Sequence, residues 1–357
     1  MKELTYKQRL TVIFVALAAV ALTLTACVGG GASAAAASKS AAASASEEAV
    51  ETPEVALNFM ESLGGSPEAF ARVADALPAE EGVHAFALLE GSPAEAAADG
   101  LEHIQAAVDE YPYDVAFAMV DLASGQGVCY NAHELHYGAS SMKAGFAAYL
   151  CSRLVESGAL ELSDCTGAWG LDYDLAHPEH WNGTFTVGSL VENTIIYSDN
   201  TAYETLRGSY EYLDYAAHTQ WMKDLGLEDL MYCYNNWYPD YTPAQGVSLW
   251  LYLWSYLQSG TETAQWLAGL LGETEVSFLR AGLGESAQLV LNKAGWDVGG
   301  GFYNTLTDCG VVIMGDRTYV VALMVNEADG AEDFGAITQL ARTLVQETNA
   351  ALASGAA

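Results

Sequence analysis

The chain has 357 residues, which is enough for one large domain or two ordinary ones with a buried core. Its content of 51% hydrophobic and 11% aromatic residues excludes a chain that is disordered throughout. The formal net charge of −33 at pH 7, from 46 acidic and 13 basic residues, argues against a nucleic-acid partner, because nucleic acid requires clustered Lys and Arg.

Residues 1–27 have the layout of a secretory signal. Three cations lie within residues 1–9, and residues 10–26 form an apolar run that is short for a membrane span. The run ends in Leu-Thr-Ala followed by Cys27, which resembles the lipobox of bacterial lipoproteins. That resemblance implies cleavage before Cys27, a lipid on its sulfur, and an extracytoplasmic protein anchored to the cell membrane. An ordinary signal with an incidental cysteine is the alternative.

Two segments separate this signal from the main domain. Residues 28–50 consist almost entirely of Gly, Ala and Ser and predict a flexible tether with a reach of roughly 25 Å. Residues 51–99 predict a short helical extension, with helix starts at Ser66, before a proline, and at Ser92, where Glu95 completes a capping box. This extension has no catalytic pattern, which leaves a structural or interaction role for it.

Residues 100–357 predict one α+β domain. An amphipathic helix at 101–110 comes first, residues 140–284 are mainly helical, and a long helix at 331–352 closes the chain. The predicted strands are 114–122, 128–131, 289–295, 309–315 and 318–326, the last two joined by a turn at Gly315. Because the strands lie at both ends of the domain, we expect one antiparallel sheet, flanked by helices, with an all-helical middle lobe.

Ser140 and Lys143 form a Ser-x-x-Lys pattern in a helix-favouring run. On a helix, positions i and i+3 share a face, so the hydroxyl and the amine can approach each other. A serine hydroxyl is a weak nucleophile unless a base takes its proton, and lysine can be that base only when it is neutral. Lowering a lysine pKa from about 10.4 to near 7 costs about 4–5 kcal/mol. Taken alone, the pattern also fits a surface lysine that follows a serine.

Two further motifs follow in the chain. Ser198 and Asn200 belong to a Ser-Asp-Asn tripeptide at a helix start, where Ser198 could relay a proton to a leaving nitrogen and Asn200 could bind a substrate carbonyl. Lys293, Ala294 and Gly295 close a strand, where the lysine could attract a substrate carboxylate and the glycine could admit a ligand backbone. Each motif has a simpler alternative: a helix-capping turn for the first and a solvated edge lysine for the second.

In this order and spacing, the three motifs resemble those of the class A β-lactamases and penicillin-binding serine peptidases, over about residues 101–352. The resemblance implies a β-lactamase-like fold and an acyl-serine hydrolase that acts without a cofactor or metal on β-lactams or cell-wall peptides. It implies Ser140 as the acylated nucleophile, Lys143 as its activator and Ser198 as a proton relay. The implied substrate-binding residues are Asn200, Lys293, Ala294 and Gly295, and the implied oxyanion hole is the backbone N–H groups of Ser140 and Trp296.

The sequence departs from this family in two places. Ala294 stands where the family usually has a threonine or serine, so one hydroxyl contact to the substrate carboxylate is missing. The loop at residues 227–243 lacks the family's Glu-x-x-Leu-Asn motif, whose glutamate activates the deacylating water, and its acids Glu228, Asp229 and Asp240 have no matching register. We therefore expect slow deacylation. A penicillin-binding D,D-peptidase-like or sensor protein that acts on cell-wall peptides is one alternative, and a catalytically inactive wall-binding lipoprotein is the other.

The cysteines and histidines give no sign of a metal site. His133 and His136 are three residues apart rather than the four of a zinc-binding helix, so we expect no metal. The cysteines after the signal have no zinc spacing, and the sequence does not define their pairing; they are Cys129, Cys151, Cys165, Cys233 and Cys309. We expect a monomer.

Overall fold

The computed structural model describes residues 58–166, 185–210, 215–227, 238–297, 304–327 and 334–355. The chain divides into two units, Met1–Leu57 and Asn58–Ala357, and all of these residues belong to the second. The predicted signal, its lipobox cysteine and the tether lie outside the described residues. None of the helices within the described ranges is long and apolar enough to cross a membrane.

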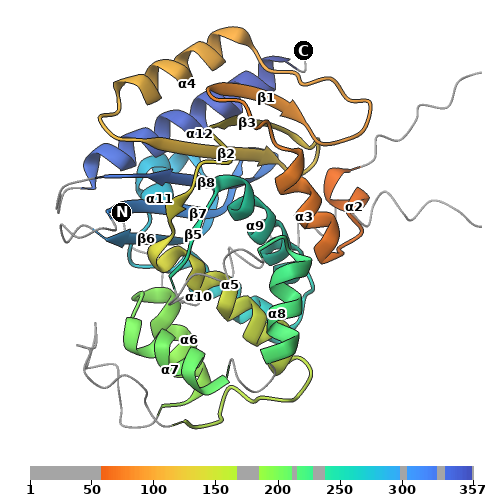
Figure 1. The fold of residues 1–357 in the computed structure, drawn as a ribbon, viewed down its shortest axis with the longest axis vertical. Helices are drawn as coiled ribbons and strands as arrows, with labels where there is room; N and C mark the ends of the chain where they lie inside the picture. Colours follow the sequence, from red (N-terminus) through yellow and green to blue (C-terminus); the bar gives the residue numbers. More distant parts are fainter. Residues whose placement is uncertain are drawn as a thin grey trace, which may run out of the picture. The chain divides into compact units, whose positions relative to one another are not determined.

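A six-stranded antiparallel sheet forms the centre of this unit (Figure 1). In spatial order its strands are β1 (Val83–Ala87), β3 (Gln126–Tyr130), β2 (Val115–Asp121), β8 (Arg317–Val325), β7 (Thr305–Met314) and β6 (Leu289–Asp297). The N-terminal and C-terminal strands join where β2 pairs with β8, from Val115 opposite Val325 to Asp121 opposite Tyr319. This pairing confirms the predicted sheet and the α+β fold class. The predicted turn at Gly315, whose φ is 63°, joins β7 to β8.

The sequence predicts a helical extension at residues 51–99, but this segment also contains a strand. Helices α2 (Phe59–Ser62) and α3 (Pro67–Ala76) are present, and the Ser66 hydroxyl caps α3 by accepting from the Ala69 amide at 3.2 Å. Strand β1, however, lies in the same segment and pairs with β3 at the edge of the sheet. This segment therefore contributes a strand to the main sheet.

No helix begins at Ser92, where the sequence predicts a capping box. Helix α4 (Ala98–Glu110) starts further along the chain and has no side-chain cap. The side chain of Gln126 on β3 binds the backbone of this region instead, donating to the Pro93 carbonyl at 2.8 Å and accepting from the Glu95 amide at 3.1 Å. A contact with a distant strand thus replaces the local helix start, because tertiary context overrides weak local preferences.

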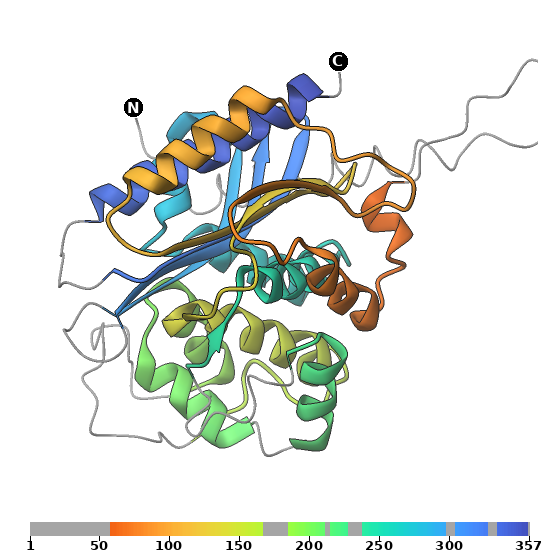
Figure 2. The same ribbon diagram turned by 45° about the horizontal axis from the view of Figure 1, so that its top comes forward.

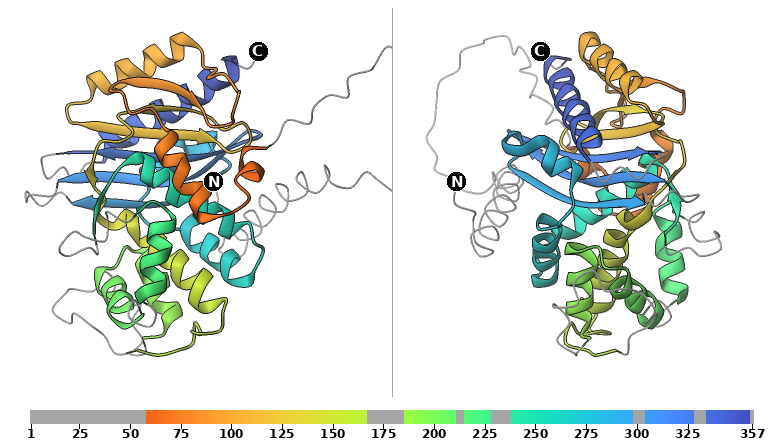
Figure 3. Two further views of the ribbon diagram at one scale, coloured as in Figure 1. Left: turned by 45° about the vertical axis from the view of Figure 1, so that its right-hand side comes forward. Right: turned by 90° about the vertical axis from the view of Figure 1, so that its left-hand side faces the viewer.

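Helices cover both faces of the sheet. On one face, α4 and α12 (Gly335–Gly355) lie side by side (Figures 2 and 3), so closely that a Cβ at Gly100 would come 2.7 Å from the Cβ of Ala351. Helix α11 (Phe278–Leu283) joins them over the hydrophobic core of that face. Helix α9 (Pro243–Leu257) packs against β2, β7 and β8 on the opposite face.

The middle of the chain forms the helical lobe that the sequence predicts. It contains α5 (Lys143–Tyr149), the π-helix η2 (Leu150–Val155), α6 (Val187–Ile196), α7 (Asn200–Tyr210), α8 (Tyr215–Asp224) and α10 (Glu262–Gly272). A 3-10 turn, η1 (Ala139–Met142), precedes α5 and packs against β6 and β7. The sequence did not predict the short pair β4 (His136–Tyr137) and β5 (Asp240–Tyr241), which links the segment before η1 to the segment before α9.

Candidate active site

Ser140 lies in the turn η1, at the entrance to α5. Ala139 before it has a φ of 42°, a left-handed conformation that L side chains rarely adopt. Three groups hold this turn by donating to the Gly138 carbonyl: the Ser141 amide at 3.1 Å, the Ser141 hydroxyl at 2.5 Å and the Thr307 hydroxyl at 3.2 Å. Ser140 is half-buried, whereas Ser141 is fully buried. Ser140 is therefore the accessible serine of the pair.

Lys143 begins α5, and its side chain is 0% exposed. Its Nζ donates to the Ser198 carbonyl at 2.6 Å and to Oδ1 of Asn200 at 2.6 Å. The rings of Tyr203 and Tyr238 have their centroids 5.5 and 5.6 Å from the same nitrogen. The hydroxyl oxygen of Ser198 is a third, more distant acceptor, 3.5 Å from the same nitrogen. The burial excludes a surface lysine.

The pKa of Lys143 is well below that of an exposed lysine. Burial is the largest cause, and the charge of Lys293 lowers the pKa further. The carboxylates of Asp199 and Glu204 raise it, with smaller effects. Lys143 therefore reaches its neutral form at a lower pH than an exposed lysine does, as a lysine base must.

The hydroxyl of Ser198 contacts both lysines of the motifs. Lys293 Nζ donates to Ser198 Oγ at 2.9 Å and to the Ala294 carbonyl at 2.8 Å, and Lys143 Nζ lies 3.5 Å from the same Oγ. Lys293 is 1% exposed, so the alternative of a solvated edge lysine is wrong. Burial lowers the pKa of Lys293 to about 7, an effect that Asp308 opposes.

The residues of the Ser-Asp-Asn tripeptide have two structural roles: one caps a helix and two contact the lysines. Asp199 is fully buried and caps α7, since its Oδ1 accepts from the Ala202 amide at 2.8 Å. Ser198, with a left-handed φ of 59°, and Asn200 instead contact the lysines. The capping turn and the site contacts are therefore both present in one tripeptide.

Strand β6 brings Lys293 and Gly295, but not the side chain of Ala294, to the turn η1 that carries Ser140. A Cβ at Gly295 would lie 2.5 Å from the Gly138 carbonyl oxygen and 2.8 Å from the Ser140 amide nitrogen. Ala294 belongs to the hydrophobic core on the α11 and α12 side. Because successive strand residues point to opposite faces, a hydroxyl at position 294 would face that core rather than Ser140.

Trp296, the second residue implied for the oxyanion hole, follows Gly295 on β6. This strand is the edge of the sheet, where alternate backbone N–H groups have no neighbouring strand. The Trp296 ring has its centroid 5.8 Å from Lys293 Nζ. The close approach of Gly295 to Ser140 brings together the two backbone segments that such a hole requires.

The loop predicted to lack a deacylating acid is described only in part. Residues 228–237, which include Glu228 and Asp229, lie outside the described residues. Asp240 is exposed and pairs with Tyr137 in the β4–β5 ladder.

Glu204 is an acidic residue of this site that the motifs did not identify. It lies half-buried on α7, and its Oε1 accepts from the Tyr238 hydroxyl at 3.2 Å. Burial raises the pKa of Glu204, while the hydrogen bond from Tyr238 and the charge of Lys143 lower it. Its spacing of four residues from Asn200, which puts both on one helix face, was the signal available in the sequence.

The cysteines of the described residues are free thiols. Cys129, Cys151 and Cys309 are buried and Cys165 is exposed, whereas Cys233 lies outside the described residues. Within the same ranges, no three His, Cys, Asp or Glu side chains are grouped so that they could hold a metal ion.

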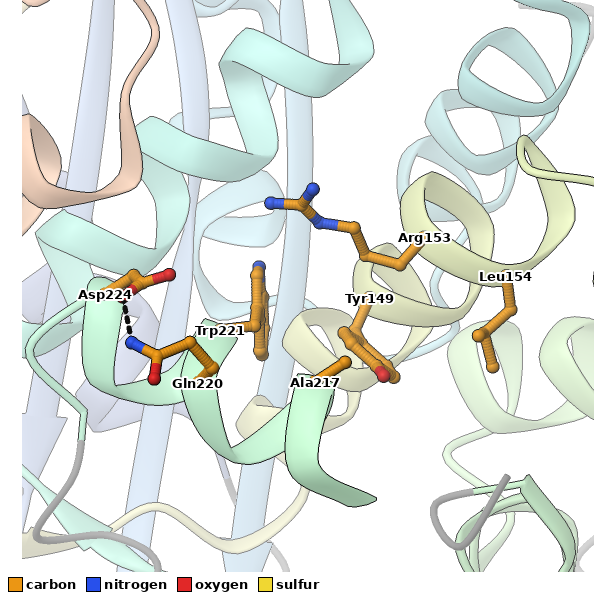
Figure 4. A pocket seen from close by; sticks show the side chains of 7 residues that line it. All are labelled: Tyr149, Arg153, Leu154, Ala217, Gln220, Trp221 and Asp224. Carbon is orange, nitrogen blue, oxygen red and sulfur yellow. Dashed lines mark hydrogen bonds between the residues drawn. The ribbon is translucent and has the colours of Figure 1, made fainter. Parts of the chain in front are cut away.

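A separate cavity of about 310 Å³ lies in the helical lobe (Figure 4). One side of it carries a hydrogen bond from the Gln220 amide to Oδ1 of Asp224, at 2.6 Å. Its lining residues are Tyr149, Arg153, Leu154, Ala217, Gln220, Trp221 and Asp224. No residue of the three motifs lines this cavity, so it is distinct from the Ser140 site.

A helical lobe against an antiparallel sheet, with a buried lysine three residues after an accessible serine, is the arrangement of a serine hydrolase of the β-lactamase type. The family model described as the Beta-lactamase enzyme family matches residues 101–348. The chain belongs to this family, which confirms the superfamily that the motifs indicate. No curated protein matches the chain.

Solved class A β-lactamases have the same fold. One from the last common ancestor of Gram-negative bacteria is 25% identical with a TM-score of 0.55, and the match covers 70% of this chain and 99% of that one. One from Mycobacterium abscessus is 19% identical with a TM-score of 0.56, covering 69% of this chain and 97% of that one. Together with the family match, this likeness makes the chain a serine β-lactamase-type hydrolase at the level of the family.

Proposed function

We propose that this protein is an exported acyl-serine hydrolase that opens β-lactam rings through an acyl-enzyme on Ser140. The observation that carries the proposal is the complete burial of Lys143, whose Nζ is hydrogen-bonded to Ser198 and Asn200. Burying an amine destabilises a fold, and an apolar side chain would serve packing better. A lysine that must become neutral to act as a base accounts for this burial.

Acylation begins when neutral Lys143 takes the proton of the Ser140 hydroxyl and Oγ bonds to the β-lactam carbonyl carbon. The backbone N–H groups of Ser140 and Trp296 stabilise the resulting oxyanion. As the ring C–N bond breaks, its nitrogen takes a proton from the Ser198 hydroxyl, and Lys143 returns to Ser198 the proton that it took from Ser140. The 3.5 Å separation of Lys143 Nζ and Ser198 Oγ supports this relay.

Lys293 has two roles in this proposal. Its Nζ donates to the Ser198 hydroxyl at 2.9 Å, which stabilises that oxygen while its proton leaves. Its charge also attracts the carboxylate that β-lactams carry beside the ring. Since an adjacent anion favours the charged form of lysine, bound substrate raises the pKa of Lys293 above its value of about 7 in the free protein.

Release of the acyl group is the slow step of the proposed reaction. The ester on Ser140 must be attacked by water, and water requires a base on its own side. The family's loop glutamate has no recognisable counterpart in residues 227–243. Loss of one positioned base is worth about 3–5 kcal/mol, or a factor of about 10² to 10⁴ in rate.

A time course with a chromogenic β-lactam tests the function and its slow step together. We expect a burst of about one product equivalent per protein, slow turnover afterwards, and an acyl-enzyme in the intact mass spectrum. Fast turnover without a burst would contradict slow deacylation. An acyl-enzyme that never releases would favour a penicillin-binding sensor, and no acylation by β-lactams or cell-wall peptides would leave only an inactive binding protein.

We also propose that a lipid on Cys27 anchors the mature protein to the outer side of the cell membrane. The layout of residues 1–27 supports the signal, and the Gly/Ala/Ser composition of residues 28–50 supports a spacer between membrane and enzyme. Substrates outside the cytoplasm would then reach the site directly.

A further inference from the structure

We propose that Glu204 on α7 is the general base that activates water for hydrolysis of the Ser140 acyl-enzyme. This inference rests on the proposed function and supplies from a helix the base that the loop at residues 227–243 does not provide by sequence. It goes beyond the three motifs, none of which includes Glu204.

The position of Glu204 follows from the first turn of α7. Asn200 begins this helix, and its Oδ1 accepts from Lys143 Nζ at 2.6 Å. Residues four apart on a helix lie one above the other on the same face. Glu204 therefore lies on the face of α7 that contacts Lys143, and the electrostatic effect of each residue on the other's pKa is consistent with this proximity.

Tyr238 fixes the orientation of the Glu204 carboxylate. The Tyr238 hydroxyl donates to Oε1 of Glu204 at 3.2 Å, and the Tyr238 ring has its centroid 5.6 Å from Lys143 Nζ. Among the described residues, Tyr238 is the hydrogen-bond donor to this carboxylate, and it occupies one of the two carboxylate oxygens. The second oxygen, Oε2, can then accept a proton from water.

The surroundings of Glu204 suit a base of moderate strength. Burial makes the carboxylate a better proton acceptor than an exposed one, because it disfavours the charged form. The hydrogen bond from Tyr238 and the charge of Lys143 act in the opposite sense. A carboxylate under these opposing influences can take a proton from water, but less well than an unpaired buried one, in keeping with slow release.

Three other acids near the motif residues have different surroundings. Asp199 caps α7 through the Ala202 amide. Asp308 lies on the opposite face of the sheet, where its Oδ2 accepts from the Leu279 amide of α11 at 2.9 Å. Asp240 is exposed on β5. Of these four acids, Glu204 is the one with a half-buried carboxylate on the Lys143 side of the site.

The chemical step balances without any further reactant. Glu204 takes one proton from a water molecule as the water oxygen bonds to the acyl carbon, which gives a tetrahedral oxyanion. When this species collapses, the bond from the acyl carbon to Ser140 Oγ breaks and the carbonyl re-forms. Oγ then receives the proton held by Glu204, so that free Ser140, ionised Glu204 and the product acid result.

The test compares Glu204→Gln with Tyr238→Phe by burst kinetics and intact mass. Glutamine keeps an oxygen that can accept from Tyr238 but cannot act as the base. We expect Glu204→Gln to form the acyl-enzyme within about threefold of the wild-type rate and to release it about 10² to 10⁴ times more slowly. Tyr238→Phe, which keeps the carboxylate, should release it within about tenfold of the wild-type rate.

Three outcomes would overturn this assignment. Unchanged release in Glu204→Gln would exclude Glu204 as the base while leaving the proposed function intact. An equal loss of acylation and release would make Glu204 a charge partner of Lys143 instead. If the wild-type protein forms no acyl-enzyme at all, the proposed function fails and the assignment of Glu204 fails with it. Thermal unfolding of each variant verifies that the fold is retained.

Discussion

Lys143 and Lys293 both contact the hydroxyl of Ser198, at 3.5 Å and 2.9 Å respectively, and both are buried. Two ammonium groups so close together in a buried site repel each other, and the charge of Lys293 accordingly lowers the pKa of Lys143. The charge on Lys293 therefore influences the protonation of Lys143. This relationship links the proposed base to the proposed substrate-binding lysine, and the predictions on both lysines depend on it.

We expect Ser140→Ala to abolish covalent labelling by an acylating β-lactam and Ser141→Ala to retain it. The Ser141 hydroxyl is engaged with the Gly138 carbonyl and the Tyr241 hydroxyl, each at 2.5 Å, so its loss should cost about 1–3 kcal/mol of stability without removing the nucleophile. Intact mass measures the label, and thermal unfolding measures the stability. Label that survives in Ser140→Ala would move the nucleophile to another residue.

Lys143→Ala should slow acylation by at least about 10²-fold, the usual scale for loss of a positioned general base. In the wild type the neutral amine is the active form, so the acylation rate should rise with pH. Because the pKa of Lys143 is lowered well below its ordinary value, this rise should be complete well below the pH range in which an exposed lysine titrates. Labelling rates measured against pH provide the profile. A rise only near the ordinary lysine pKa would exclude Lys143 as the base.

Lys293→Met should move the same pH profile upward. Methionine keeps most of the side-chain volume but removes the charge that lowers the pKa of Lys143, so Lys143 should then need a higher pH to become neutral. The substitution should also weaken the binding of substrates that carry a carboxylate. The readouts are the midpoint of the acylation profile and the substrate concentration at half-maximal rate. A profile that stays in place would show that the lysines do not interact.

Gly295→Ala should reduce acylation by about 10²-fold in a folded protein, because a displacement of the reacting group of about 1 Å has an effect of this size. The added methyl group would meet backbone atoms of Gly138, Ser141 and Ser140 at 2.5, 2.7 and 2.8 Å, so the turn η1 must shift. Gly100→Ala is the matched control, since it introduces a comparable clash between α4 and α12. Equal labelling in both variants would contradict the close approach of β6 to Ser140.

Cys27→Ala should leave the protein unprocessed or release it from the membrane. In the proposed lipobox this cysteine is both the cleavage site and the lipid acceptor, so no other residue of the signal could replace it. Cell fractionation combined with the mass of the membrane-associated form measures the outcome. A processed variant that still fractionates with the membrane would refute the lipobox.

Much of the fold was predictable from local patterns. The strands 114–122, 289–295 and 318–326 correspond to β2, β6 and β8 because alternating and continuous apolar runs have few other structures available. The secondary-structure predictions fail where contacts with residues distant in the sequence determine the local structure. The region of Ser92 is held by Gln126 of β3, and β1 forms because the edge of β3 offers backbone partners. Neither partner can be identified from the local sequence.

The sequence by itself determined the chemical groups and their order: a serine followed by a lysine at helical spacing, a second hydroxyl with an amide, and a lysine next to a glycine on a strand. Only the tertiary structure decided how deeply these groups are buried, how basic the lysines are and which way the side chains point. Burial makes Lys143 and Lys293 weaker bases than exposed lysines. This burial depends on contacts of α5 and β6 with the segment at Ser198, which lie 55 and 95 residues apart in the sequence. Strand alternation turned Ala294 toward the core. The same packing brought Glu204 to the Lys143 face of α7, because proximity in a folded chain depends on packing and not on sequence distance.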